Sequence, residues 1–80
     1  MRISIVSSDP GYENLQAILD SGVDASIELN GLVVRNCITA DEELGFVKYY
    51  VSDARGGIIK NEATGEAWTH VSWGVVEIIK

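Results

Sequence analysis

The segment 25–35, which reads ASIELNGLVVR, decides the fold because it carries the sequence signature of a β-hairpin. Apolar and polar residues alternate over 25–29, which is the period of a strand with one face on a core. Asn30-Gly31 then favours a two-residue type I′ turn, in which both residues have positive φ. A turn there brings four apolar side chains to one face of the paired strands: Ile27, Leu29, Leu32 and Val34.

A helix is expected before this hairpin, over about residues 10–21. Asp9 can accept hydrogen bonds from free N–H groups at a helix start, and Pro10 suits the first helical position. Gly22 stands where a glycine commonly ends a helix. The apolar residues between these signals recur at helical spacing: Tyr12, Leu15, Ile18 and Leu19. A first strand is predicted over residues 2–7.

Further strands are predicted after a polar break at 41–45. They are expected at 46–52, 58–60, 67–72 and 75–79, with turns at 53–57 and 61–66. The predicted order is β-α-β-β-β-β-β-β, with one helix packed on an antiparallel, strongly twisted sheet or open barrel. This is the α+β class. No repeat or linker divides the chain, so residues 1–80 are expected to form a single domain.

The composition is that of a small globular protein, with 46% hydrophobic and 22% charged residues among 80. No apolar stretch approaches the length of a membrane span, so no membrane association is expected. The net charge is −6, and residues 9–43 hold eight acidic residues against one basic residue. Generic binding to a phosphate backbone is disfavoured by this charge.

Cys37 and His70 are the only nucleophile and base that the composition offers for covalent catalysis. No glycine-rich elbow surrounds Cys37, and no acidic residue flanks His70. Because cysteine is among the most buried residue types, we predict a structural role for Cys37. No phosphate-binding glycine motif is present either. The sequence therefore predicts no catalytic residue, no enzyme activity and no cofactor.

Asp41, Glu42 and Glu43 offer three adjacent carboxylates. Their spacing lacks the alternate-residue pattern and the central glycine of a calcium loop. A structural zinc site needs four ligands of the Cys or His type, and the chain has one of each. No metal site is therefore predicted, and the three acidic residues are interpreted as a solvated turn.

Aromatic residues indicate protein recognition, because Tyr and Trp are enriched at interfaces and one helix cannot cover both faces of a sheet. A stacking platform for nucleic acid would need a basic groove, which this chain lacks, so no direct nucleic-acid binding is expected. The side chains predicted to form an aromatic, partner-binding face are Phe46, Tyr50, Trp68 and His70.

Three short motifs stand in the later part of the chain: Asn30-Gly31-Leu32-Val33-Val34, Cys37-Ile38-Thr39-Ala40-Asp41-Glu42-Glu43-Leu44-Gly45 and Gly74-Val75-Val76-Glu77-Ile78. With them, about residues 25–79 resemble a type of small uncharacterised protein encoded by tailed phages and prophages. Residues 1–24 lie outside the resemblance. It implies a phage or prophage setting and no reaction.

Two functions follow from this setting. The favoured one is a structural or assembly protein that binds copies of itself or another phage protein. The alternative is a host-directed inhibitor, acting on a defence or transcription protein, whose acidic residues Asp41, Glu42 and Glu43 occupy a basic, nucleic-acid-binding site. Either would act in the cytoplasm of the bacterial host or in the virion. The favoured function predicts that Tyr50→Ala or Trp68→Ala weakens binding more than reversing the three acidic charges.

Overall fold

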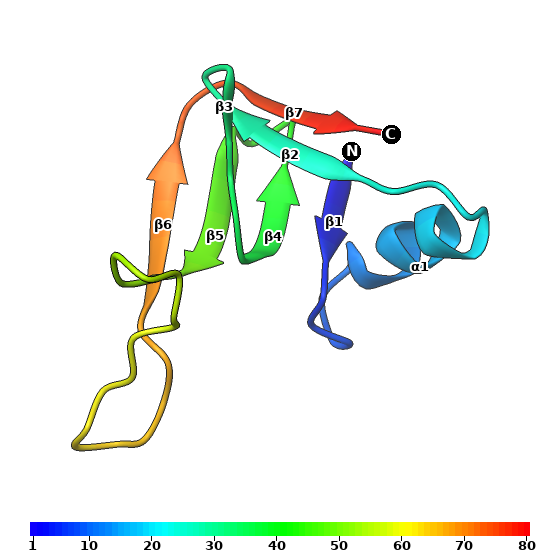
Figure 1. The fold of residues 1–80 in the computed structure, drawn as a ribbon. Helices are drawn as coiled ribbons and strands as arrows, with labels where there is room; N and C mark the ends of the chain where they lie inside the picture. The colour runs from blue at the N-terminus through cyan, green and yellow to red at the C-terminus, as the bar shows by residue number, and fades with distance from the viewer.

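The computed structural model describes residues 1–80 and contains one helix and seven strands in two antiparallel sheets (Figure 1). The four-stranded sheet has the order β1 (Arg2–Ser4), β4 (Cys37–Asp41), β5 (Phe46–Tyr50) and β6 (Thr69–Trp73). The three-stranded sheet has the order β3 (Leu32–Val33), β2 (Ser26–Leu29) and β7 (Val76–Ile79). The α+β class is confirmed, but two sheets replace the expected single sheet or open barrel.

The β2–β3 hairpin forms as predicted. Asn30 and Gly31 both have positive φ, at 51° and 82°. Leu29 lies opposite Leu32, and the Val34 N–H donates to the carbonyl of Ile27 over 2.8 Å. Leu32 is nevertheless 75% exposed. The tip of the hairpin therefore extends beyond the core that its base helps to build.

The helix α1 spans Tyr12–Asp20, which is shorter than the predicted 10–21. It begins later because the Asp9 carboxylate accepts the Gly11 N–H over 2.7 Å and so holds a turn ahead of the helix. The end is as predicted, since Gly22 follows with a φ of 77°. In Figure 1, α1 lies beside β1 at one side of the molecule. No helix here has the length and apolar character needed to cross a membrane.

One of the seven expected strands is absent as a strand, and one strand of the structure was not expected. The sequence pattern does not predict β4, although it lies between β1 and β5, because its residues 38–41 are all buried and do not alternate. Residues 58–60, predicted as a strand, form only isolated bridges, Ser52 to Ile58 and Lys60 to Ala67. Figure 1 shows the segment between β5 and β6 as a long loop projecting beyond both strands.

The base of this loop is closed by three backbone hydrogen bonds arranged in a ring. The Val51 N–H donates to Trp68, the Trp68 N–H to Ile59, and the Ile59 N–H to Val51, each over 2.9 Å. Each residue thus gives one bond and accepts one, which satisfies the backbone where the sheet ends.

The core lies between the sheets and is small, since 11 of the 80 residues are buried. Ala40 and Val47 at the centre of the four-stranded sheet are fully buried. The helix adds one buried side chain and the second sheet adds two. The six buried residues of the core cluster are Ile3, Ile18, Ile27, Ala40, Val47 and Val76.

The two sheets are joined at a corner where three turns meet. The Gly74 N–H donates to the Gly45 carbonyl over 2.9 Å, and the Asn30 N–H to the Val75 carbonyl over 2.8 Å. Asn30 Oδ1 accepts the Val75 N–H over 2.9 Å. A Cβ atom placed on Gly74 would lie 2.6 Å from Nδ2 of Asn30. Because of this close approach of the hairpin tip, any side chain at position 74 would displace the side chain of Asn30.

Candidate protein-binding surface

Phe46 and Tyr50 lie on the outer face of the four-stranded sheet, which we define as the face opposite the core. Val47 is fully buried and points to the core. Because side chains alternate along a strand, Phe46, Lys48 and Tyr50 point to the opposite, outer face. On β6, Trp73 lies opposite Phe46, with 5.3 Å between the ring centroids. Phe46 and Tyr50 are half-buried, whereas Trp73 is 68% exposed. The most exposed aromatic ring of the outer face is therefore Trp73, which is not among the predicted binding residues.

Trp68 and His70 lie on the other face. His70 is opposite Tyr49, with 5.7 Å between the ring centroids, and Tyr49 shares the inward direction of Val47. Trp68 is two residues before His70, so its side chain points to the same face of the sheet. The prediction that Phe46, Tyr50, Trp68 and His70 form one aromatic face is thus wrong in its geometry, because the β5–β6 register divides them into two pairs on opposite faces. Whether either pair binds a partner stays a prediction.

Cys37 and His70 are not brought together. Cys37 on β4 lies opposite Tyr49 on β5, and Tyr49 lies opposite His70 on β6. Since neighbouring strands are about 4.8 Å apart, the backbones of Cys37 and His70 are about 10 Å apart with Tyr49 between them. Burial raises the pKa of the Cys37 thiol to about 11. The thiol is therefore protonated at neutral pH, which suits the structural role predicted for it.

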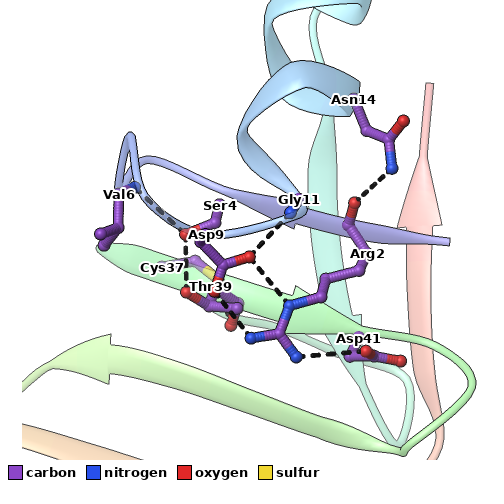
Figure 2. A network of polar contacts seen from close by, with 9 residues as sticks. All are labelled: Arg2, Ser4, Val6, Asp9, Gly11, Asn14, Cys37, Thr39 and Asp41. Atoms are coloured by element: carbon purple, nitrogen blue, oxygen red, sulfur yellow. Dashed lines mark hydrogen bonds and ion pairs between the residues drawn. The ribbon is translucent and has the colours of Figure 1, made fainter.

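Asp41 is not part of a solvated turn, as the sequence predicts, but is buried in a polar network (Figure 2). The Arg2 guanidinium donates to both oxygens of Asp9 over 2.9 and 2.7 Å and to Asp41 over 3.3 Å. It also lies 5.3 Å above the Phe46 ring centroid. The Arg2 hydrogen bonds lower the pKa of Asp9 to about 2. The Leu44 N–H, followed by Arg2, lowers the pKa of Asp41.

Beneath this network lies a hydroxyl pair. Ser4 Oγ and Thr39 Oγ1 are 2.8 Å apart and buried, and Ser4 Oγ also accepts the Val6 N–H over 3.1 Å. No buried side-chain nitrogen or oxygen of the protein lacks a hydrogen-bond partner. The polar contacts thus hold the loop of residues 5–11 over the outer face at β1 and β4. On β5 this cover reaches Phe46, which lies under Arg2, whereas Val71 and Trp73 on β6 are exposed.

Glu42 is engaged as well, and more closely than Glu43. Glu42 Oε2 accepts the Ile78 N–H over 3.1 Å, and Oε1 lies 3.3 Å from the amino group of Met1. The Ile78 N–H is the main cause of the lowered pKa of Glu42. The Glu43 side chain is 87% exposed. Glu43 Oε1 also lies 3.8 Å from the amino group of Met1, so of the three acidic residues predicted for the alternative site only Glu43 keeps most of its side chain open to a basic partner.

Apolar side chains gather at the uncovered end of the four-stranded sheet. Val71 shares the outer face with Trp73 and is 41% exposed. Leu44, two residues before Phe46, and Val75, two residues after Trp73, are 64% and 66% exposed. We call these five residues the β6 surface: Leu44, Phe46, Val71, Trp73 and Val75. Sequence alternation at Val71 and Trp73 is the signal that marks them as neighbours on one face.

A cleft of about 470 Å³ lies between the β2–β3 hairpin and the end of β5. Leu32 and Val33 form one wall, and Tyr49, Tyr50 and Val51 form the other. Tyr50 is the only predicted binding residue in its lining. The cleft has the size and apolar character of a site for a side chain or a small ligand.

The protein exposes more surface than its mass accounts for. A compact monomer of 8.7 kDa exposes about 4,700 Å². This chain exposes 5,471 Å², an excess of about 700 Å². Fifteen large apolar side chains are among the exposed residues. These side chains are spread over residues 1–79 of the chain.

Comparisons with protein-family models, with curated protein sequences and with solved structures found no match to this chain.

Proposed function

We propose that this protein is non-enzymatic and acts by binding another protein chain through the β6 surface. The observation that carries the proposal is Trp73, which is 68% exposed beside other exposed apolar side chains on an uncovered sheet face. Exposed apolar patches of this kind mark interaction sites, and tryptophan is the residue most enriched among those that dominate binding energy. The separation of Cys37 from His70 supports a binding role over a catalytic one.

Within this role, we propose a structural or assembly function in a phage or prophage setting. The setting comes from the resemblance of residues 25–79 to small phage and prophage proteins. An assembly protein works by burying apolar area against other subunits, and the excess exposed area fits that use.

The alternative, an acidic inhibitor of a host protein, has less support. Such a protein needs carboxylates free to meet basic groups on its target. Asp41 is bound by Arg2 and the Leu44 N–H, and Glu42 by the Ile78 N–H. Their charge is already used within the fold, so reversing it would damage the protein before it altered a binding surface.

Salt and two variants separate these functions. Immobilised wild-type protein, Trp73→Ala and the control Lys80→Ala are each exposed to extract of phage-infected bacteria at about 0.1 M and about 1 M salt. Apolar contacts persist at both, whereas charge pairs are screened as the Debye length falls from about 10 Å to about 3 Å.

The assembly function predicts a partner held at both salt concentrations by wild type and by Lys80→Ala and lost by Trp73→Ala. The variants Tyr50→Ala and Trp68→Ala, one from each sheet face, show which aromatic pair contributes. A partner released by salt and indifferent to Trp73→Ala would instead support the inhibitor.

A further inference from the structure

The outer edge of β6 presents unpaired backbone groups. The bonds from Val51 to Trp68 and from Gly74 to Gly45 show which residues pair with β5. In an antiparallel pair, backbone groups point alternately to the partner strand and away from it. By this alternation His70 and Ser72 face β5, while Thr69, Val71 and Trp73 point their N–H and C=O groups outward. No loop, turn or side chain of the protein bonds to these three.

On β1, the opposite edge of the same sheet, the outward backbone groups are capped. The Ser4 N–H donates to the Gly11 carbonyl over 3.2 Å. The Arg2 carbonyl accepts from Asn14 Nδ2 over 2.9 Å. The loop and the first turn of α1 thus close this edge, which is how natural sheets avoid edge-to-edge pairing.

The two edges of the three-stranded sheet are also poorly suited to pairing with another strand. On β7 the outward N–H of Ile78 is bound by Glu42 over 3.1 Å. The other edge, β3, has two residues, which is too short to template a strand. Of the four edges in the fold, only β6 offers an uncapped strand of five residues.

The open segment has defined ends. The Trp68 N–H is taken by Ile59 in the ring at the loop base, and the Gly74 N–H is taken by Gly45 at the corner. Between these ends the outward residues are Thr69, Val71 and Trp73, with Val71 at the centre. This arrangement is symmetric about Val71.

We propose that β6 pairs antiparallel with β6 of a second copy of this chain, with the two-fold axis between the two Val71 residues. The inference rests on the proposed binding function and names its partner. In this register Val71 faces Val71 of the other copy, and Thr69 faces Trp73. Each of these pairs exchanges two backbone hydrogen bonds. A shift of two residues in either direction would leave one outward residue of each copy unpaired.

The charge pattern of β6 fits a second copy. The chain carries a net charge of −6, but β6, which reads THVSW, contains no Asp, Glu, Lys or Arg. Two negatively charged chains can therefore meet at this strand without like charges facing each other across the axis.

Charge reversal at the axis tests the geometry. In Val71→Lys, two like-charged side chains would extend side by side from Cα atoms about 5.5 Å apart across the axis, and the same holds for Val71→Glu. We expect each variant to raise the dimer dissociation constant at least about tenfold at low salt. Val71→Lys should be the weaker self-associator, because Lys48 lies opposite Val71 on β5. An equal mixture of the two variants should recover association as a heterodimer.

The readout is sedimentation equilibrium of wild type, each variant and the mixture. Val33→Lys and Val33→Glu are the matched controls, since Val33 is an exposed valine on the short edge strand β3. They should associate like wild type. Recovery in the mixture also shows that both Val71 variants are folded.

Three results would overturn the pairing: a wild type that stays monomeric at all concentrations, Val71 variants that associate normally, or a mixture that does not recover. None of these touches the proposed binding function, which is judged by loss of a captured partner in Trp73→Ala. A monomeric wild type that still captures a partner would refute the second copy and retain the binding role.

Discussion

Gly74→Ala perturbs the corner that joins the two sheets. The added Cβ would lie 2.6 Å from Nδ2 and 2.7 Å from Oδ1 of Asn30, so the Asn30 side chain has to move. Its Oδ1 then loses the Val75 N–H, which costs about 1 kcal/mol. Accommodating an extra carbon in a tight site adds about 1–2 kcal/mol. We expect a total destabilisation of about 2–3 kcal/mol, or a fall in Tm of about 10–20 °C for a domain of this size.

A double-mutant cycle with Asn30→Gly, followed by thermal or urea unfolding, isolates the contact. Glycine is compatible with the positive φ at position 30, so this single change should cost about 1 kcal/mol through the lost hydrogen bond. In the Asn30→Gly background the three atoms nearest the new methyl group are gone, and Gly74→Ala should become nearly neutral. Equal costs of Gly74→Ala in both backgrounds would refute the reasoning.

Three further predictions concern stability and reactivity. Gly31→Val should destabilise the hairpin by about 1–2 kcal/mol, since φ at that position is 82° and a β-branched residue is strained there; an unchanged thermal melt would contradict this. Because Asp9, Asp41 and Glu42 have lowered pKa values in the folded state, their stabilisation is present above about pH 5 and lost as the pH falls toward about 2. A Tm that is constant down to about pH 3 would be inconsistent with that linkage. Cys37, with its pKa raised to about 11, should react slowly with a thiol reagent at neutral pH and quickly once unfolded, and rapid labelling of the native protein would show an accessible thiol.

Local chemistry explains what the sequence predicts well. The Asn30-Gly31 turn and the end of α1 at Gly22 depend on positive φ, which few residues adopt, so both can be located from residue type alone. The strand β4 escapes detection because it is buried on both faces, with Thr39 and Asp41 under a loop instead of in water. Its pattern then lacks the alternation by which strands are recognised.

The site was harder to predict because it depends on contacts between distant residues. Arg2 lies 39 residues from Asp41, and no local signal couples them. The division of the aromatic residues follows from the β5–β6 register, and a shift of one residue would move Trp73 to the other face. A long loop joins β5 to β6, and no short turn fixes how the two strands align, so their register cannot be predicted from the sequence.

Hydrogen exchange resolved by residue tests the central claim, that β6 is an interaction edge. The N–H groups of His70 and Ser72 face β5 and should be protected at every protein concentration. Those of Thr69, Val71 and Trp73 face outward in the single chain. The account predicts that these three exchange rapidly in dilute protein and become protected as the concentration rises and copies pair. Rapid exchange of all three in concentrated wild-type protein would contradict it.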